Sequence, residues 1–500
     1  MPAMERAAES EKKGRIELEV EIENFGPISS GKIRLRPLTI FIGPNNSGKS
    51  YTAMLIRSIF ESLSAFEISE FRFPRYIFRT GFPHDLVRKY NEEVAKIIEC
   101  QARGLSEPGE YEVSRQQVED LLREIIKYFF EEKLESEITR TFACPSKELI
   151  KAGKSSSMLR IRLGSHSITL QLSDEGLKIV EYPRLDSPRI RIKVSERRFP
   201  SLSITHKDGE ILIEVEKGFP LELFQQEILD SILAYIAFSL LKGVSAPCYY
   251  LPAARSGILQ GHKALTASIV RKIPFAGIEE LEIPSFPGVV ADFLSSVIAL
   301  PERKSPLFKL SQELEEELLK GEIEAKLPEG EYSYPEVRYR SREVELPLHR
   351  ASSSVSELAP LILYLKYYVR PGSVLVIEEP EAHLHPENQR VLAKLLVRLV
   401  RSGVHVLVTT HSDYLLEQLN NFILLSRLEP GKRVEQGYRE GDYLRPGEVA
   451  VYVFYYDGEA RGCRVREAEV SGKEGILQEE FLRVDEALYG ETLRITREMG

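Results

Sequence analysis

The chain lacks the features that mark secreted and membrane-spanning proteins. It contains no tryptophan, and its four cysteines (Cys100, Cys144, Cys248 and Cys463) are scattered without a C-x-x-C pair. Neither a disulfide scaffold nor a zinc knuckle is therefore indicated. No apolar run approaches the length of a membrane span, and the first residues are charged where a signal peptide is apolar. We expect a cytoplasmic protein without membrane contact.

An excess of basic residues is also missing. The 67 lysines and arginines face 76 aspartates and glutamates, which gives a formal net charge of -9. This balance argues against a surface coated in positive charge, although a local basic groove remains open. With 500 residues, 43% of them hydrophobic, the chain is too long for one simple core, and we expect two or three folded modules.

The most informative stretch present is FIGPNNSGKS, which ends at Ser50. Apolar residues precede it and predict a strand, while apolar residues at helical spacing follow it. The pattern G-x-x-x-x-G-K-[ST] in that setting indicates a phosphate-binding loop, because glycines let N–H groups turn inward and the helix N-terminus adds positive charge. Lys49 would reach the β- and γ-phosphates, and Ser50 would bind Mg²⁺. The alternative is a surface turn. The predicted nucleotide-binding residues are Gly43, Pro44, Asn45, Asn46, Ser47, Gly48, Lys49, Ser50 and Tyr51.

A site for ATP also needs carboxylates at the end of a neighbouring strand. The stretch VLVIEEPEAHLHP supplies Glu378 for the metal shell and Glu379 to polarise or deprotonate the attacking water. The alternative is a pair of exposed acids that end a strand. The next apolar strand ends at His411, where an imidazole would bond the γ-phosphate, unless it is a capping or packing histidine. His405 is assigned to the core.

The remaining pattern predicts how the elements follow one another. Alternation from 15 to 42 predicts antiparallel strands that lead into the loop. Helical runs are expected near 86–98, 113–134 and 221–241, with alternating strands between the last two. Buried strands from 373 and 404, joined by a helix over 386–399, imply a parallel sheet. A hairpin that turns at Asp457 and Gly458 and a last helix near 478–488 complete the chain.

The loop GPNNSGKS, the strand VLVIEEPEAHLHP and the strand end TTHS together resemble the ABC-type ATPase heads of the SMC, RecF and OLD group. They are most similar to the stand-alone prokaryotic AAA-type ATPases near OLD proteins, which lack a TOPRIM module. The resemblance covers 15–61 and 346–425, and the tail only loosely. It implies an ATPase that uses ATP and Mg²⁺ and forms at least a dimer through its ATP sites.

The resemblance defines the expected fold and its division. We expect an α/β P-loop NTPase with an ABC-ATPase-like head, in which a mixed, mainly parallel sheet is joined to an antiparallel β subdomain. Residues 15–62 would form the N-terminal part of the head, 63–219 a large α+β insertion, 220–430 the C-terminal part of the head, and 431–500 a C-terminal α/β extension.

The resemblance also implies a signature element that binds the γ-phosphate of the ATP held by a partner subunit. The candidate is HRASSSVSELAPLILYL, in which Ser353 takes the place of the signature serine, with Ser354 and Ser356 beside it. Ser354 and Val355 replace the two usual glycines, and Ser356 stands where glutamine is usual. Taken alone, this stretch is a well-capped helix.

Further site residues follow from the same resemblance. A magnesium-sensing loop is expected, and Arg255 and Gln260 in LPAARSGILQGH are its candidates. Glu378 replaces the aspartate of transporter-type domains. His383 and His385 are typical of the near relatives, and His385 follows the catalytic acid where subunits would meet. A zinc site at this histidine pair would need two more ligands.

Four functions compete. The first is an ATP-driven switch that acts on DNA or on an effector protein, because relatives serve in DNA repair and in defence against phage. A nuclease of the OLD type needs a D-x-D pair, but the aspartates after His411 are unpaired in sequence, so a nuclease would have to be a partner chain. A transporter subunit is disfavoured by the insertion. A module that traps ATP with little turnover is the fourth, and phosphate release distinguishes it.

Contact with nucleic acid would depend on a set of basic residues that could line one sheet face and neutralise phosphates. The alternative is a solvated face paired with acids such as Glu214 and Glu216. The basic residues are Arg160, Arg162, Arg189, Arg191 and Lys193.

Overall fold

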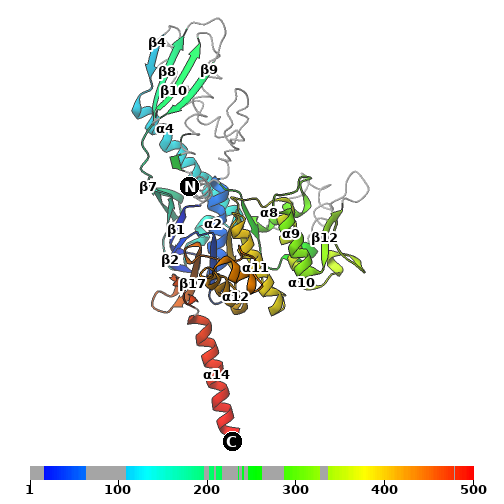
Figure 1. The fold of residues 1–500 in the computed structure, drawn as a ribbon. Coiled ribbons are helices and arrows are strands. Elements are labelled where there is room, and N and C mark those ends of the chain that lie inside the picture. The colour runs from blue at the N-terminus through cyan, green and yellow to red at the C-terminus, as the bar shows by residue number, and fades with distance from the viewer. Residues whose placement is uncertain are drawn as a thin grey trace, which may run out of the picture.

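The computed structural model describes residues 16–63, 109–195, 202–207, 210–216, 235, 239–240, 246–261, 286–326, 336–477 and 479–499. A head built on a large sheet forms the centre of the molecule, with a smaller sheet at the end of an arm and a single helix that projects away from the head (Figure 1). The helices predicted near 86–98 and 221–241 lie outside the described residues, apart from isolated positions in the second.

The elements have the following bounds. The strands of the main sheet are β1 Leu18–Phe25, β2 Ile28–Arg34, β3 Leu38–Ile42, β5 Ser157–Leu163, β6 His166–Ser173, β7 Gly176–Glu181, β11 Cys248–Leu251, β15 Val374–Glu378, β16 His405–Thr409, β17 Val449–Asp457 and β18 Gly462–Ala468. The smaller sheets contain β4 Gly109–Glu112, β8 Arg189–Ser195, β9 Leu202–Lys207 and β10 Glu210–Glu216, then β12 Gly321–Lys326, β13 Glu336–Ser341 and β14 Glu345–Pro347, then β19 Val470–Ser471 and β20 Gly475–Ile476. The α-helices are α2 Lys49–Leu63, α4 Arg115–Lys127, α5 Leu134–Phe142, α8 Gly288–Ile298, α9 Phe308–Leu314, α10 Ser353–Tyr367, α11 Pro386–Arg401, α12 Asp413–Leu425, α13 Pro430–Glu435 and α14 Glu479–Met499.

Among the described residues, the main sheet has eleven strands in the order β11-β15-β16-β3-β17-β18-β2-β1-β5-β6-β7. The first five strands run parallel to one another. The β17–β18 pair is the predicted hairpin, and the strands from β2 to β7 pair antiparallel. A parallel half and a largely antiparallel half therefore form one continuous sheet, which confirms the predicted fold class.

The parallel half is covered by helices on both faces. Strands β3, β15 and β16 are buried at every position, as expected for the continuous apolar runs that encode them. Ile40 and Ile42 pack with α10, α11 and α12, whereas Phe41 points to the opposite face and packs with α2. Because these strands are parallel, their carboxyl ends open at one edge of the sheet, where ligands bind in open α/β folds.

The segment predicted as an insertion is divided between two sheets. Strands β5 to β7 extend the main sheet beside β1, whereas β4, β8, β9 and β10 form a separate sheet at the end of the arm that contains α4 (Figure 1). Alternation along a strand indicates which side is buried but not which sheet the strand joins. The boundaries at 62, 219 and 430 stay predictions, although part of 63–219 is hydrogen-bonded into the main sheet.

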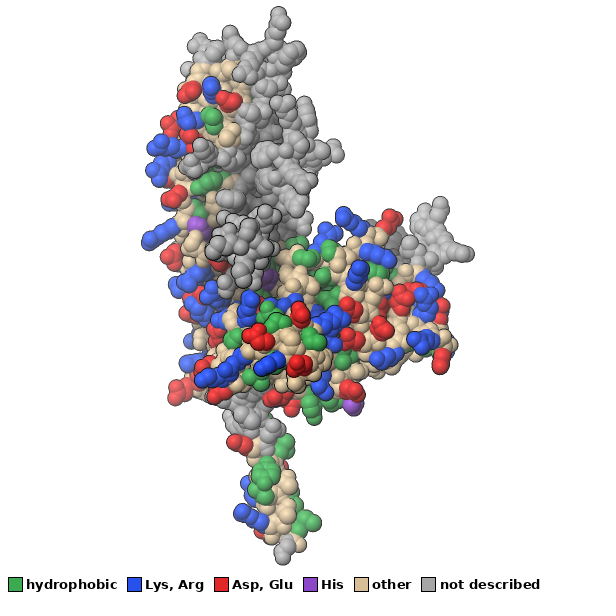
Figure 2. All heavy atoms as spheres, viewed as in Figure 1, with side chains coloured by type: hydrophobic (Ala, Val, Ile, Leu, Met, Phe, Trp, Pro, Cys, Tyr) green, Lys and Arg blue, Asp and Glu red, His purple; other side chains and the backbone are tan. Residues whose placement is uncertain are grey.

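The basic residues predicted to line one sheet face lie in two different sheets. The prediction of a single basic face is therefore wrong. On β5, Arg160 pairs with Glu21 and Arg162 with Glu19 of β1. On β8, Arg191 pairs with Glu210 and Lys193 with Glu214 of β10. Figure 2 shows acidic and basic side chains intermingled over the head and arm on this face. The solvated, acid-paired alternative fits these contacts better.

Among the described helices, none combines the length and the apolar character needed to cross a bilayer.

Candidate nucleotide site

The phosphate loop joins β3 to α2, as its sequence predicts. The loop positions Pro44, Asn45 and Asn46 are exposed, and the Ser50 hydroxyl lies on an exposed residue in the first turn of α2. Ser47 is 1% exposed, and its hydroxyl oxygen has no hydrogen-bond partner among the described residues. Exposed loop residues thus lead directly into a helix N-terminus, which is an anion-binding arrangement.

Glycine is required at two positions of this loop. Gly43 has φ +135° and Gly48 has φ +99°, which are values that residues with a side chain rarely adopt. A Cβ at Gly43 would collide with the main-chain carbonyl of Phe454 in β17, and one at Gly48 would lie 2.7 Å from Ile28 Cγ1. Both the main-chain conformation and the close packing against neighbouring strands therefore exclude a larger residue.

The Lys49 ammonium is held at the mouth of the loop. It donates hydrogen bonds of 2.9 Å to the Gly43 carbonyl and 2.8 Å to the Pro44 carbonyl, and the residue is 7% exposed. Burial lowers the pKa of Lys49, whereas the charges of Glu379, Glu378 and Glu381 act in the opposite direction. The two predicted acids, Glu378 and Glu379, thus act on this lysine from a distant part of the sequence.

Glu378 ends β15 as a buried acid that is 7% exposed. Its Oε2 accepts a 3.1 Å hydrogen bond from Ala253 N, while its Oε1 is buried and accepts none within normal geometry from the described residues. Tyr250 lies beside this carboxyl: burial, followed by the charge of Glu378 and a side-chain hydrogen bond with it, raises the pKa of the Tyr250 phenol well above its usual value. A buried carboxylate at the end of a strand needs partners for its charge, and a bound cation or water would supply them.

Glu379 is the first residue after β15, and its main chain is strained. Its φ is +43°, a left-handed value that costs a non-glycine residue about 1–3 kcal/mol. The conformation is held by a 2.9 Å hydrogen bond from Glu379 N to the carbonyl of Thr409 at the end of β16. Such strain is typical of functional positions.

His411 follows β16, and Glu381 fixes its main chain. The Glu381 Oε1 atom accepts hydrogen bonds from His411 N at 2.8 Å and from the Thr410 hydroxyl at 2.7 Å. Desolvation, followed by the charge of Lys49, lowers the pKa of the His411 imidazole, whereas Glu379 raises it. The histidine thus lies within the electrostatic reach of both the lysine and the acid.

Glu381 was not predicted as a site residue. The third acid of EEPEAH was the available signal, but nothing in the sequence shows that this side chain reaches the next strand. Its Oε2 is buried without a hydrogen bond among the described residues, and burial raises the pKa of this carboxyl.

The two candidates for the magnesium-sensing loop differ in position. Gln260 is exposed near the end of a helical turn, and no hydrogen bond of its side chain is found in the described structure. Arg255 is 2% exposed and donates to the main-chain carbonyls of Glu378 and Glu379. Arg255 therefore holds the main chain of both acids, and the role predicted for it in a magnesium-sensing loop stays a prediction.

The predicted signature serines lie at the N-terminus of α10. Ser352 caps the helix and accepts from Val355 N at 3.4 Å, while Ser353 is exposed and Ser354 is half-buried. Ser356 is 3% exposed, and its hydroxyl donates to the Leu348 carbonyl at 3.0 Å. This placement differs from the prediction for Ser356, because its hydroxyl is directed into the protein.

His385 caps α11, and its Nδ1 accepts a 3.3 Å hydrogen bond from Glu387 N. It is exposed at the carboxyl edge of the sheet, and so is His383. The role predicted for His385 at a subunit contact stays a prediction.

The residues at this edge fit a magnesium nucleotide. Within the described residues no group of three or more histidines, cysteines or acids could hold a metal by itself. Mg²⁺ bound with a nucleotide does not require such a group, because one or two protein ligands act together with phosphates and water. The exposed Ser50 hydroxyl and the unsatisfied Glu378 oxygen supply that number.

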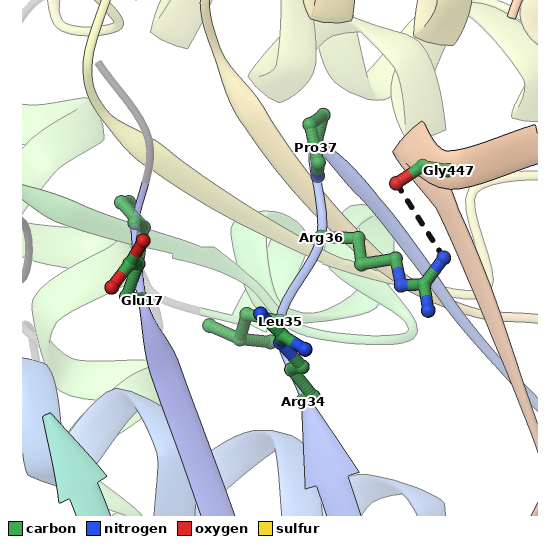
Figure 3. Close-up of a pocket in the computed structure, with 7 residues that line it drawn as sticks. Glu17, Arg34, Leu35, Arg36, Pro37 and Gly447 are labelled. Carbon is green, nitrogen blue, oxygen red and sulfur yellow. Dashed lines mark hydrogen bonds between the residues drawn. The ribbon is translucent and has the colours of Figure 1, made fainter. Parts of the chain in front are cut away.

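A separate pocket of about 170 Å³ lies at the opposite end of β3, between Glu17, Arg34, Arg36 and Gly447. Figure 3 shows the Arg36 guanidinium directed toward the Gly447 carbonyl, to which it donates at 3.5 Å. None of the predicted site residues lines this pocket.

Comparison with known proteins defines the family. The model of the AAA ATPase domain family matches residues 18–155 and 278–416, which is more than half of the chain. The protein therefore belongs to this family. It is an ATP-binding ATPase, and its match includes the phosphate loop, both strand-end acids and His411. No curated protein matches the sequence.

Similar solved structures are heads of SMC proteins. An Smc head bound to the C-winged helix domain of ScpA has 11% identity and a TM-score of 0.40, with 91% of this chain and 98% of that chain covered. The SMC head domain from Thermotoga maritima has 10% identity, a TM-score of 0.35 and coverage of 91% and 100%. The Smc head with an extended coiled coil, bound to the C-terminal domain of ScpA derived from Pyrococcus furiosus, has 12% identity, a TM-score of 0.38 and coverage of 95% and 99%. We draw no conclusion from similarities of this size, and the narrower resemblance to OLD-type relatives stays a prediction.

Proposed function

We propose that the protein is an ATP-driven switch whose heads dimerise head to tail around ATP. Separation of the heads after hydrolysis would act on DNA or on a partner effector protein, in DNA repair or in defence against phage. Lys49 and the loop N–H groups would bind the phosphates, and Ser50 and Glu378 would hold Mg²⁺. When bound, the metal neutralises charge on the phosphates. Glu379 would accept the proton of the attacking water, and His411 would contact the γ-phosphate.

The observation that carries the proposal is the meeting of Lys49 with Glu378 and Glu379 at one edge of the sheet. Glu378 ends β15 and Glu379 follows it, while Lys49 begins α2 after the loop that leaves β3, a parallel strand of the same sheet. The charges of both acids raise the pKa of the lysine, against the larger effect of burial. Dimerisation is supported by a different feature: Ser353 is exposed at the N-terminus of α10, where a helix dipole and hydroxyls could accept the phosphate of a second subunit.

The experiment is the mass of the particle in solution, with and without ATP. The Glu379→Gln variant is expected to bind ATP and to hydrolyse it much more slowly, so its mass should double on addition of ATP and Mg²⁺. The same variant carrying Ser353→Asp should bind ATP but remain at the mass of one chain, because the added negative charge repels the partner's phosphate. Ser341→Asp, on β13 away from the loop, is the matched control and should still dimerise.

Two results contradict the switch: a mass that does not respond to ATP, or a response that Ser353→Asp leaves unchanged. The target is a separate question. Co-purification with the ATP-trapped Glu379→Gln variant would recover bound DNA or an effector protein, and treatment with a nuclease before elution distinguishes a direct protein partner from one held through DNA.

A further inference from the structure

One buried arginine connects both strand-end acids to the helix that carries the exposed serines. The Arg255 Nη1 donates to the Glu378 carbonyl at 2.6 Å and to the Pro252 carbonyl at 3.2 Å, and its Nη2 donates to the Glu379 carbonyl at 3.3 Å. Its Nε donates to the Glu357 carbonyl at 3.2 Å. One planar guanidinium therefore contacts the main chain of two consecutive acids and of α10.

The same arginine has a charged partner. Its Nε lies 3.3 Å from Glu357 Oε2, and the side chains of the two residues are 2% and 1% exposed. The other oxygen of Glu357 accepts from Ser256 N at 3.2 Å and from the Ser256 hydroxyl at 2.6 Å. Buried charges need partners. Glu357 Oε1 is hydrogen-bonded, whereas Oε2 has only the ion-pair contact with Arg255, and this contact links α10 to the loop after β11.

We propose that Arg255 is a positioning residue for the catalytic acids and that its ion pair with Glu357 ties their main chain to α10. The inference rests on the proposed function. A left-handed residue such as Glu379 needs its surroundings to hold it, and the rigid fork of an arginine fixes two adjacent carbonyls in a way that a lysine does not. Glu357 lies one helical turn after Ser353, so a shift of the α10 N-terminus on contact with a second subunit would reach Glu379 through this pair.

Arg255→Lys tests the positioning role, because it keeps the charge and removes the fork. We expect the ATP dissociation constant to change by less than about twofold and kcat to fall by about tenfold to a hundredfold, the range for misplacing a catalytic group. The matched control is Arg433→Lys. Arg433 is also buried and donates to two carbonyls, those of Leu425 and Glu440, but it touches no site residue, so its kcat should stay at the wild-type value.

Glu357→Gln tests the pair with a milder change, because the amide oxygen still accepts from Ser256. It should also lower kcat without weakening ATP binding. The kcat of the double variant Arg255→Lys/Glu357→Gln should be little lower than that of the less active single variant, because each substitution breaks the same connection. Equal losses of kcat in the Arg433 and Arg255 variants, or additive losses in the double variant, would overturn the inference.

The result also separates this inference from the proposed function. If the wild-type protein shows no ATP hydrolysis that depends on Lys49, the proposed function fails. If hydrolysis depends on Lys49 and Glu379 but Arg255→Lys retains the wild-type kcat, only the positioning role fails. The thermal unfolding temperature of each variant is compared with that of Arg433→Lys. A variant that is no less stable than Arg433→Lys but is less active has lost activity for a reason other than unfolding.

Discussion

The amide of Thr410 donates a 3.0 Å hydrogen bond to the carbonyl of Phe41. Phe41 lies two residues before the first glycine of the phosphate loop, and Thr410 directly precedes His411. The carbonyl of the neighbouring Thr409 accepts from Glu379 N at 2.9 Å. Main-chain hydrogen bonds thus connect the loop strand, the histidine strand and the acid strand in a fixed register, so the geometry of the site follows from the sheet.

Replacing Lys49 with alanine should abolish ATP binding, because Lys49 is the one basic residue between Gly43 and Ser50. Its ammonium is held in place by the carbonyls of Gly43 and Pro44. Isothermal titration with ATP and Mg²⁺ measures the effect. The control is Lys32→Ala, since Lys32 is an exposed lysine that pairs with Glu19 and Glu21 on β1. If Lys49→Ala binds ATP with wild-type affinity, the loop is not the ATP-binding site.

Alanine substitutions at two glycines should separate strain from collision. Gly372→Ala adds a side chain at φ +88° with nothing within 4 Å, so it should cost about 1–2 kcal/mol of unfolding free energy through the main chain alone. Gly43→Ala adds a collision with the Phe454 carbonyl and should cost more, and it should also weaken ATP binding. Chemical denaturation and titration with ATP measure both. An equal cost at the two positions would contradict the packing described for the loop.

The pKa of His411 should lie below its usual value of 6.5 in the absence of nucleotide, because desolvation and Lys49 disfavour the charged ring. The imidazole is then neutral at pH 7. As the pH falls below about 6.5, the unfolded chain takes up this proton first. The contribution of His411 to stability is therefore present above that pH and lost below it. The imidazole resonance of His411, compared with a His411→Asn spectrum, reports the pKa, and titration above 6.5 would contradict the placement.

Local patterns were enough to predict the elements of the site. The strand, glycine loop and helix around Lys49, the acid strand ending at Glu378 and the strand ending before His411 all have the predicted type. They could be predicted because parallel strands buried on both faces are continuous apolar runs, and because phosphate binding demands glycines and a lysine at fixed spacing.

Contacts between distant segments could not be predicted in the same way. Arg255 was a candidate for the magnesium-sensing loop, but nothing in the sequence showed that its side chain donates to the carbonyls of both acids. Ser356 was expected to face a phosphate and instead donates to Leu348. The basic residues of β5 and β8 lie in separate sheets. Each of these outcomes depends on tertiary packing, which periodicity along one segment does not encode.

The central claim is that Glu379 activates the water that attacks a triphosphate bound at Lys49. Phosphate release by wild-type protein and by Glu379→Gln, at an ATP concentration that titration shows to saturate both, tests it most directly. The account predicts unchanged ATP affinity and a rate lowered by about a hundredfold to ten-thousandfold, the usual contribution of a general base. Release at the wild-type rate from Glu379→Gln would contradict it.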